Sequence, residues 1–271
     1  MNYRHGYHAG NFADVVKHLA LITILLHLKK KEAAFAVIDS HAGRALYDLA
    51  GEQAGKTNEA LGGIARLRGL TGGLTPALEA YLSLVKESGD IQYPGSPLLA
   101  AKLLRTQDRL TAIEKHPEEF ATLKETLSPF RNAAAEQGDG YARTIKLLPP
   151  PSRRGLILID PPFEAADEFQ TLAQTVIAGL RKFATGIFLV WYPIKSQAAA
   201  DAFAGEILAG GADRMSLVDT QISAPSGKLD RAGLLVINPP YGFEAAMFAS
   251  ADIVAPLLAA DIAVKRLAGA D

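Results

Sequence analysis

The sequence predicts an α/β fold built on a mostly parallel sheet. Four short apolar runs have the length and the flanking residues of buried strands, at residues 35–38, 156–159, 187–191 and 234–237. Amphipathic stretches of helical length separate them. Strands that alternate with helices form a sheet with both faces covered, in which each strand is apolar along its whole length.

Helices are expected in five of these amphipathic stretches, at residues 13–30, 76–87, 97–105, 168–183 and 196–208. The second has a clear start signal. Thr75 is a favoured N-cap residue, and Pro76 follows it at the first helical position.

Two weaker strand patterns complete the predicted sheet. Residues 110–114 are a mostly apolar run that ends on an acid, and residues 216–222 alternate apolar and polar side chains. A turn-rich segment joins the second run to residues 234–237. We therefore expect these last two runs to form a hairpin, with residues 234–237 as an antiparallel edge strand.

The chain is expected to form a single domain, residues 1–271, with one insertion. Between Gly43 and Tyr93 no convincing strand pattern occurs, and Gly62-Gly63 and Gly72-Gly73 break the segment. It is too long for an ordinary connection between two elements of a sheet. We interpret residues 46–92 as a small helical insertion subdomain.

Composition excludes several kinds of site. The chain has no cysteine, which excludes disulfides, thiolate zinc sites and cysteine nucleophiles. Its formal net charge is −1, so any contact with nucleic acid must come from a local basic patch. The apolar run at residues 19–26 is far shorter than the roughly 20 residues of a membrane span, and no cleavage site follows it. We expect a soluble cytoplasmic protein.

The sharpest motif is Asp160-Pro161-Pro162-Phe163, which directly follows the predicted strand at residues 156–159. Open α/β sheets bind ligands at the carboxyl ends of their strands. The two prolines stiffen the loop, and an aromatic side chain beside a rim of acceptors suits a flat heterocycle that carries an amino group. The alternative is that the prolines merely end the strand.

Methylation of the N6 amine of adenine would use these groups directly. The lone pair of that nitrogen is delocalised into the ring, and acceptors that hold its two hydrogens free it for attack. We assign this role to the Asp160 carboxylate and the Pro161 carbonyl. Phe163 would stack on the base, which is worth about 1–3 kcal/mol. The methyl donor would be a sulfonium. Its positive charge spreads toward the nitrogen during transfer, and a nearby carboxylate stabilises that charge.

A second copy of the pattern, Asn238-Pro239-Pro240-Tyr241, follows the last predicted strand. If that strand is antiparallel, its end faces away from the ligand-binding edge. We therefore interpret this copy as a turn.

The binding site for the methyl donor is predicted from acidic and small residues that follow the other predicted strands. The loop Asp39-Ser40-His41-Ala42-Gly43 lets a cofactor approach the backbone, and it lacks the glycine pattern of dinucleotide sites. Glu114 ends the second predicted strand, where an acid can bind ribose hydroxyls. We expect a further strand, the third along the chain, directly before Asp139-Gly140, and we expect these two residues to meet the adenine ring of the donor.

The N-terminus crowds basic and aromatic residues together, among them Tyr3, Arg4, His5, Lys17 and His18. Basic side chains bind the phosphates of a nucleic acid and aromatic rings stack on its exposed bases, so this segment is typical of a nucleic-acid-binding surface. The alternative is a solvated tail with a core histidine at position 18. No adjacent carboxylate cluster supports a metal site at His5, His8 and His18, and we expect none.

Residues 50–57 resemble a relaxed phosphate-binding P-loop that ends in Gly55-Lys56-Thr57. A P-loop follows a buried strand and opens a helix. Residues 46–50 do not have a strand pattern, and Ala50 replaces the first glycine. We interpret the segment as an exposed turn.

Taken together, these motifs resemble the RlmJ family of bacterial 23S ribosomal RNA adenine-N6 methyltransferases along nearly the whole chain. The resemblance is carried by Tyr3-Arg4-His5, residues 8–18 (HAGNFADVVKH), Asp39-Ser40-His41-Ala42-Gly43, residues 93–98 (YPGSPL), Glu114-Lys115-His116-Pro117, Asp139-Gly140, residues 152–163 (SRRGLILIDPPF), residues 184–187 (ATGI) and Trp191-Tyr192-Pro193. The C-terminal quarter matches less well.

The resemblance implies a Rossmann-like class I methyltransferase that uses S-adenosylmethionine and no metal. It implies modification of adenine 2030 of 23S rRNA, on RNA that carries few proteins. We also expect a monomer without an obligate protein partner. The residues expected around the donor are Lys17, His18, His41, Ser96, Glu114, Asp139, Gly140 and Asp160. Those expected at the RNA are Tyr3, Arg4 and His5, and those expected in catalysis are Asp160, Pro161 and Phe163.

Two residues depart from the family pattern. Phe163 stands where a tyrosine is expected, and no second glycine occurs near position 45. Three other functions stay open from the residues alone: a DNA adenine methyltransferase, a nucleotide hydrolase that uses Gly55-Lys56-Thr57, and a non-catalytic RNA-binding protein. The absence of a visible target-recognition domain weighs against the first.

Overall fold

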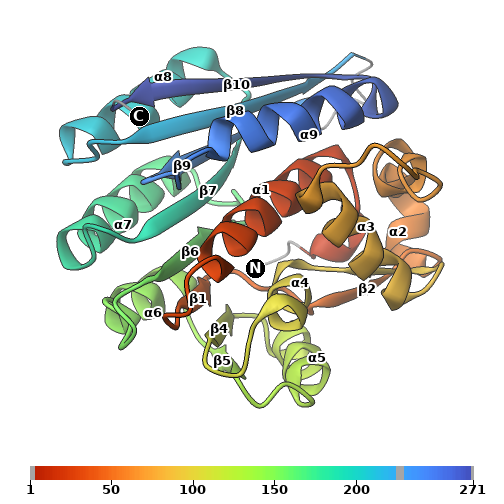
Figure 1. Cartoon of the computed structure of the whole chain (residues 1–271), viewed down its shortest axis with the longest axis horizontal. Coiled ribbons are helices and arrows are strands. Elements are labelled where there is room, and N and C mark those ends of the chain that lie inside the picture. Colours follow the sequence, from red (N-terminus) through yellow and green to blue (C-terminus); the bar gives the residue numbers. More distant parts are fainter. Residues whose placement is uncertain (1–3, 224–228, 270–271) are drawn as a thin grey trace.

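A single large sheet organises the computed structural model, which describes residues 4–223 and 229–269 (Figure 1). Its strands are β1 (Ala36–Asp39), β4 (Arg109–Glu114), β5 (Ala133–Gln137), β6 (Gly155–Ile159), β7 (Ile187–Pro193), β8 (Met215–Ile222), β9 (Arg231–Ile237) and β10 (Ala260–Ala268). They lie in the order β10-β8-β9-β7-β6-β1-β4-β5. The predicted α/β class is confirmed.

Five neighbouring strands, from β5 through β4, β1 and β6 to β7, are parallel to one another. Their carboxyl ends therefore meet at one edge of the sheet. The loops that follow β1, β4, β5 and β6 carry most of the residues that the sequence singles out, and the sheet brings them side by side.

The prediction for the last strands is only partly right. β8 and β9 do form an antiparallel pair, but β9 lies between β7 and β8 and is antiparallel to both. The edge strand is β10, which is antiparallel to β8 and was not predicted. The physical reason lies in burial: nearly all of β9 is buried, as in an interior strand, whereas β10 has mostly exposed or half-exposed residues and lacks an apolar pattern.

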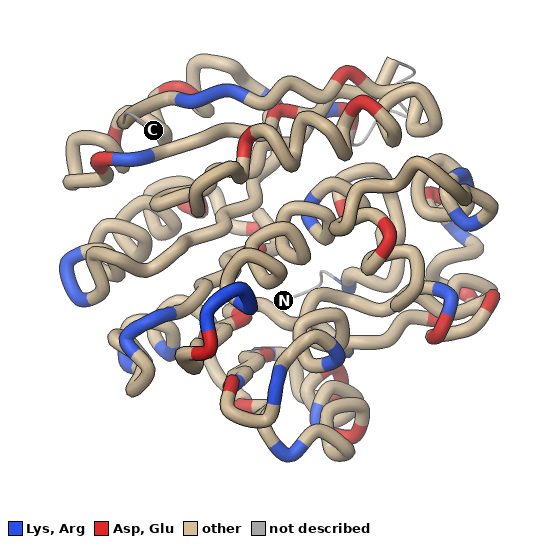
Figure 2. The backbone as a smooth tube through the Cα atoms, in the orientation of Figure 1, with Lys and Arg blue, Asp and Glu red and all other residues tan. Residues whose placement is uncertain are grey.

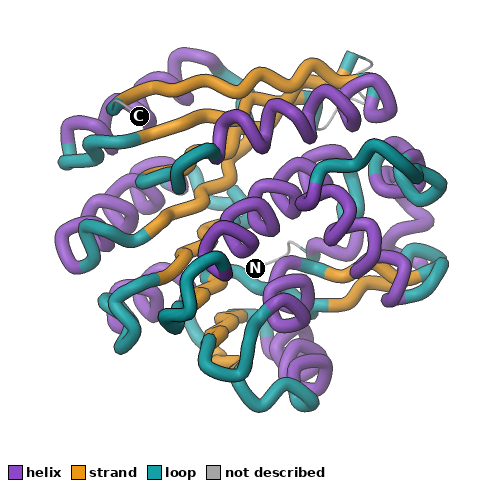
Figure 3. The backbone as a smooth tube through the Cα atoms, viewed as in Figure 1, coloured by secondary structure: helices purple, strands orange, loops and turns teal. Residues whose placement is uncertain are grey.

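Helices cover both faces of the sheet (Figure 3). Leu156 and Leu158 of β6 pack into the core on one side, and Ile157 and Ile159 pack into the core on the other. The first face carries α1 (Phe12–Lys29), α3 (Pro76–Ser88), α4 (Ser96–Leu103), α5 (Pro117–Leu127) and α9 (Phe243–Leu258), and the second carries α6 (Gly140–Leu147), α7 (Glu168–Lys182) and α8 (Gln197–Ala209). In the described part of the chain, no helix is long and apolar enough to cross a membrane.

Helix α1 is buried on almost every side, since it packs against α3, α4, α9 and the sheet (Figure 1). It begins where the side chain of Asn11 accepts a hydrogen bond from the Asp14 amide, a standard N-cap. Its buried residues include Asp14, Lys17 and His18. Buried polar groups need partners, which must come from within the fold or from a bound ligand.

The segment that the sequence predicts to be a helical insertion, residues 46–92, begins and ends in short strands that were not predicted. β2 (Leu46–Asp48) pairs with β3 (Gln92–Pro94) in a separate two-stranded antiparallel sheet. Three-residue strands are too short to produce a recognisable periodicity. Between them lie α2 (Glu52–Thr57), two short 3₁₀ turns (Glu59–Gly62 and Ile64–Arg66) and α3.

The P-loop-like segment is a helix and not the exposed turn that was expected. Gly51 caps the N-terminus of α2, and Gly55, Lys56 and Thr57 all lie within the helix. Lys56 is exposed and pairs with Glu52 one turn earlier, an arrangement that stabilises a short helix. These residues therefore do not form a loop whose amides could surround a phosphate.

Candidate functional site

Two clefts meet at the carboxyl edge of the parallel strands. The first, which we call the Glu114 cleft, holds about 580 Å³ of empty space with the open solvent at its mouth included, and the second, the Phe163 cleft, about 820 Å³. Both are lined by His5, Lys17, Asp160 and Pro162. The loop after β6 therefore separates two binding spaces and contacts both.

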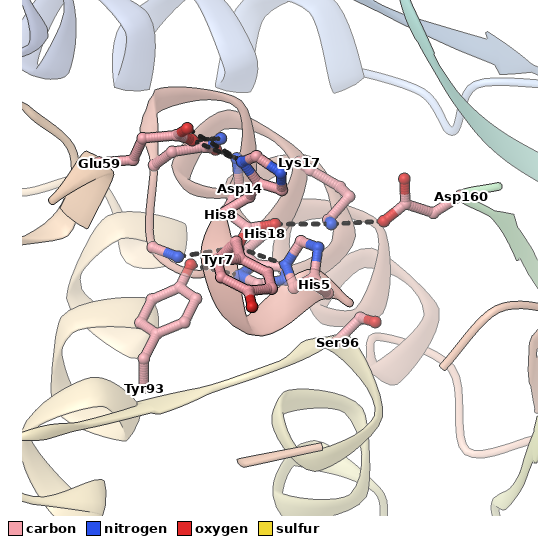
Figure 4. A network of polar contacts seen from close by, with 12 residues as sticks. His5, Tyr7, His8, Asp14, Lys17, His18, Glu59, Tyr93, Ser96 and Asp160 are labelled. Carbon is pink, nitrogen blue, oxygen red and sulfur yellow. Dashed lines mark hydrogen bonds and ion pairs between the residues drawn. The ribbon is translucent and has the colours of Figure 1, made fainter. Parts of the chain in front are cut away.

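Lys17 lies at this junction and joins α1 to the loop after β6 (Figure 4). Its Nζ atom lies 2.7 Å from Asp14 Oδ1 and 2.5 Å from Asp160 Oδ2. Burial alone would lower the pKa of Lys17, but the two carboxylates outweigh it and hold that pKa well above its ordinary value. Lys17 is thus a permanent cation that fixes one oxygen of Asp160.

Asp14 was not among the predicted site residues, yet it organises the N-terminal segment. Its carboxylate accepts hydrogen bonds from His5 Nε2 and the Gly10 amide, each at 2.9 Å, besides that from Lys17. Burial would raise the pKa of Asp14, but the charges of His5 and Lys17 hold it well below the usual range. The capping pattern at Asn11 marks the start of the helix in the sequence, but no sequence signal marks Asp14 as the partner of Lys17.

His18, the next residue along α1, points into the fold toward the insertion. Burial lowers its pKa to about 3, so the ring is neutral. Its Nδ1 atom lies 2.7 Å from the Tyr93 hydroxyl, and its Nε2 atom is buried without a partner among the described residues. The ring also lines the Glu114 cleft.

The loop after β1 places His41 against the start of α6. His41 Nδ1 lies 2.7 Å from Ser40 Oγ, and burial lowers the pKa of the ring to about 4. Gly140 packs so closely that a Cβ atom there would lie 2.0 Å from the Ser40 carbonyl oxygen. Only glycine fits at this contact.

Glu114, at the end of β4, presents its carboxylate to the cleft that we named after it. Its oxygens accept hydrogen bonds from the amides of Gly43 (2.9 Å) and His116 (2.7 Å). Burial raises its pKa despite these bonds. A carboxylate held in this way can still accept hydrogen bonds from a pair of hydroxyl groups.

Asp39, at the end of β1, is a second acid that was not among the predicted site residues. Its Oδ2 atom accepts a 2.6 Å hydrogen bond from Ser96, and its Oδ1 atom is buried without a partner among the described residues. Burial raises its pKa to about 7, with a further contribution from the charge of Asp160. It is therefore a buried acid that changes charge near neutral pH.

The Phe163 cleft has an aromatic and proline-rich lining. Phe163 itself has φ of +49°, a left-handed backbone that bulky residues rarely adopt, and its ring packs edge-on against Phe169 and Trp191. Trp191, Pro193 and Lys195, from the end of β7 and the loop that follows it, complete this side of the cleft. None of these three was predicted as a site residue.

The comparisons with known proteins agree on one family. Residues 32–267 match the family model described as "Ribosomal RNA large subunit methyltransferase D, RlmJ". The chain belongs to this family. The match extends through β9 and most of β10, so it includes the C-terminal quarter of the chain.

Two relatives and one solved structure are similar to this chain over nearly its whole length. "Ribosomal RNA large subunit methyltransferase J" of Escherichia coli (strain K12) is 39% identical over 253 residues, which cover 91% of this chain and 90% of the relative. The Haemophilus influenzae protein of the same name is 35% identical over 254 residues, with the same coverage. A crystal structure of a Legionella pneumophila protein matches 95% of this chain and 98% of its own, with 30% identity and a TM-score of 0.88.

The departure from the RlmJ pattern near position 45 has a structural counterpart. Ala45 has φ of +70° and is fully buried. This left-handed backbone favours glycine, the residue that the family resemblance leads one to expect there. Alanine in this conformation costs about 1–2 kcal/mol, which the surrounding packing must offset.

Most predicted donor-site residues come together. Lys17, His18, His41, Ser96, Glu114 and Asp160 all line the Glu114 cleft. Asp139 and Gly140 do not line it. They begin α6 beside His41, where Asp139 caps the helix and pairs with Lys115.

The residues predicted to contact RNA do not all lie in one cleft. Arg4 and His5 line the Glu114 cleft, where Arg4 pairs with Glu118 at 2.8 Å, and His5 also lines the Phe163 cleft. Tyr3 lies outside the described residues. Across the part of the chain that the structure describes, no three His, Cys, Asp or Glu side chains are arranged to hold a metal ion.

The second tetrapeptide lies at the opposite edge of the sheet. Because β9 is antiparallel to β7, its last residue, Ile237, pairs with Phe188 near the start of β7. The side chain of Asn238 donates hydrogen bonds to the carbonyls of Ala184 and Gly186, both at 2.8 Å. Asn238 thus closes a turn, in agreement with the prediction.

Removal of the Lys17 charge should destabilise the whole fold. Lys17→Met leaves the carboxylate of Asp14 buried with one cation fewer, and breaking a buried ion pair from one side costs about 3–5 kcal/mol. Urea unfolding at pH 7 measures the loss. The matched control is Lys56→Met, which breaks an exposed pair on α2 and should leave the urea midpoint unchanged. Equal midpoints for the two variants would contradict the role given to Lys17.

Proposed function

We propose that this chain transfers the methyl group of S-adenosylmethionine to N6 of an adenine in 23S rRNA, with adenine 2030 as the expected target. The observation that carries the proposal is the position of Asp160-Pro161-Pro162-Phe163 between two clefts. Asp160 and Pro162 line both spaces, and Phe163 lines one. An enzyme that transfers a methyl group from a donor to a planar base must hold the two molecules side by side, and two clefts that share one loop can do so.

The Glu114 cleft suits the donor. The Glu114 carboxylate can accept hydrogen bonds from ribose hydroxyls. His41 also lines the cleft and lies beside Gly140, and we expect the adenine ring of the donor near His41, Asp139 and Gly140. The Nε2 atom of His18, which has no partner in the part of the chain that the structure describes, supplies an unused polar contact. When bound, the donor supplies a methyl group activated by a positively charged sulfur.

The Phe163 cleft suits the target adenine, extruded from its RNA stack. With Lys17 on Oδ2, the Oδ1 atom of Asp160 has no hydrogen-bond partner among the described residues. Asp160 Oδ1 and the Pro161 carbonyl would accept the two hydrogens of the exocyclic amine, and Phe163 would stack on the base. An extruded base would be sequestered between these groups and the lining side chains.

The reaction is a single displacement. The N6 lone pair forms the new N–C bond as the C–S bond breaks, and the bonding pair leaves with sulfur. The nitrogen then loses a proton, which Asp160 is positioned to receive or to pass to solvent. Asp160 also stabilises the positive charge that spreads from sulfur to nitrogen during transfer.

RNA contact must depend on local groups, because the chain as a whole is not basic. Figure 2 shows Lys and Arg interspersed with Asp and Glu along the backbone. Arg4, His5, His8 and Lys195 line the clefts and are the basic side chains that we expect to meet RNA. Tyr3, which lies outside the described residues, is expected to meet RNA as well. We propose further that the chain acts as a cytoplasmic monomer and forms one methyltransferase domain, with residues 46–92 as an insertion.

The direct test is methylation of 23S rRNA purified from a strain that lacks the mark. Wild-type protein should methylate one adenine, mapped by mass spectrometry, and unlabelled DNA should not compete. Asp160→Asn should lower kcat/KM by about 100-fold or more, as loss of one electrostatic contact to a transition state does. Asp252→Ala, an exposed acid on α9, should retain full activity. Methylation by Asp160→Asn at the wild-type rate would end this proposal.

The two tetrapeptides provide a matched pair of aromatic residues. Phe163→Ala should lower kcat/KM by roughly 5- to 150-fold, which corresponds to 1–3 kcal/mol of lost base stacking. Tyr241→Ala removes an 82% exposed aromatic from the same position of the second tetrapeptide and should change nothing. Methylation assays with one RNA preparation compare the two variants. A full rate for Phe163→Ala would remove Phe163 from the acceptor site.

Donor binding should depend on pH through Asp39. Its pKa of about 7 makes it neutral at pH 6 and anionic at pH 8. A sulfonium cation is attracted by the anion, so the affinity for S-adenosylmethionine should rise by about three- to tenfold over this interval. Calorimetry measures the change. S-adenosylhomocysteine, whose sulfur is neutral, should give a flatter pH profile of affinity, and so should the Asp39→Asn variant. An equally steep profile in either case would show that the charge of Asp39 does not attract the sulfonium.

A further inference from the structure

Three buried side chains form a hydrogen-bonded row behind the Glu114 cleft. Tyr81 of α3 lies 2.8 Å from Tyr93 of β3, oxygen to oxygen, and the Tyr93 hydroxyl lies 2.7 Å from His18 Nδ1 (Figure 4 shows the latter pair). Tyr81 and Tyr93 are 0% exposed and His18 is 1% exposed. The row runs from the insertion to the wall of the cleft.

The protons of this row can be placed by counting acceptors. If Tyr81 donates to Tyr93 and Tyr93 donates to His18 Nδ1, both hydroxyl hydrogens have an acceptor. His18 is neutral, and with Nδ1 as an acceptor its single proton must lie on Nε2. That N–H is the only proton of the row left without a partner among the described residues, and His18 lines the Glu114 cleft.

The opposite direction is costly. If His18 Nδ1–H donated to Tyr93 and Tyr93 donated to Tyr81, the hydroxyl hydrogen of Tyr81 would have no acceptor, because Tyr93 is its only hydrogen-bond partner among the described residues. A buried donor without an acceptor is strongly disfavoured. An empty acceptor position on Tyr81, as in the first direction, is tolerated more easily because the oxygen still makes one hydrogen bond.

We propose that Tyr93 is a positioning residue that holds His18 as the Nε2–H tautomer, so that His18 donates a hydrogen bond to the carboxylate of the methyl donor. The proposal rests on the proposed function. The carboxylate is the anionic group of S-adenosylmethionine, and basic side chains line the same cleft as His18. Lys17 precedes His18 on α1, and Arg4 and His5 line the same space.

This proposal gives the insertion a function. Tyr81 belongs to α3 within residues 46–92, and Tyr93 belongs to β3, which closes the insertion by pairing with β2. The register of that pair sets Tyr93 opposite Tyr47, another residue that lines the Glu114 cleft. The insertion thereby acts as a rigid support for the donor site, independently of any contact with RNA.

Two variants differ by which hydroxyl they lack. Tyr93→Phe removes the group that contacts His18, and its dissociation constant for S-adenosylhomocysteine should rise by about tenfold, the equivalent of 1.4 kcal/mol. Tyr81→Phe removes an equally buried hydroxyl but leaves Tyr93 donating to His18, and its dissociation constant should stay within about twofold of wild type. Calorimetry measures both, and thermal unfolding confirms that each variant folds. Equal losses in the two variants would overturn the proposal.

Two further measurements separate positioning from a general loss of structure. Nitrogen-15 NMR of the histidine rings, with His18 assigned by comparison with His18→Gln, should show Nε2–H in wild type and Tyr81→Phe, but a mixture of tautomers in Tyr93→Phe. In methylation assays, Tyr93→Phe should raise KM for the donor and leave kcat unchanged. An Nδ1–H tautomer in wild type would overturn this proposal alone, whereas failure of wild type to bind S-adenosylhomocysteine would overturn the proposed function as well.

Discussion

The Lys17 ammonium, buried between Asp14 and Asp160, is the interaction on which the arrangement of the site depends. Burial of a charge is unfavourable, and it is offset here because two carboxylates lie within 2.7 Å of Nζ. One carboxylate belongs to α1 and the other to the loop after β6, so the ion pairs fix α1 to that loop. Asp14 in turn holds His5 and the Gly10 amide, which extends the same network into the N-terminal segment.

The sheet supplies the second constraint. Asp39, Glu114 and Asp160 are far apart in the sequence, but they end or directly follow β1, β4 and β6, which are neighbours in the sheet. The surroundings of the three carboxyl groups at this edge differ, and so do their pKa values and partners. Asp39 titrates near 7, Glu114 has a raised pKa while its oxygens are held by two amides, and Asp160 pairs with a cation. Three acids of similar chemistry can therefore serve different groups of the ligands.

Sequence patterns predicted the residues whose position follows from strand order, and they missed those whose role depends on packing. Glu114 and Asp160 were predicted because an acid at the carboxyl end of a buried strand has a known place in an α/β sheet. Asp14 was missed because its partners, His5 and Lys17, are identifiable only once α1 is buried. Trp191 was missed as a site residue because only the position of β7 beside β6 sets it against Phe163. β10 was missed because its residues are largely exposed and have no apolar pattern.

The two copies of the acid-or-amide-Pro-Pro-aromatic pattern show how much of the function depends on strand direction. Asp160 and Asn238 each follow a buried strand and precede two prolines and an aromatic residue. β6 runs parallel to its neighbours and delivers Asp160 to Lys17 and the two clefts. β9 runs against them and delivers Asn238 to the carbonyls before β7, which leaves Tyr241 exposed. The tetrapeptide therefore forms a stiff loop with hydrogen-bond acceptors at either edge of the sheet. Only at the edge that holds Asp160 do a buried cation, Lys17, and two clefts lie beside those acceptors.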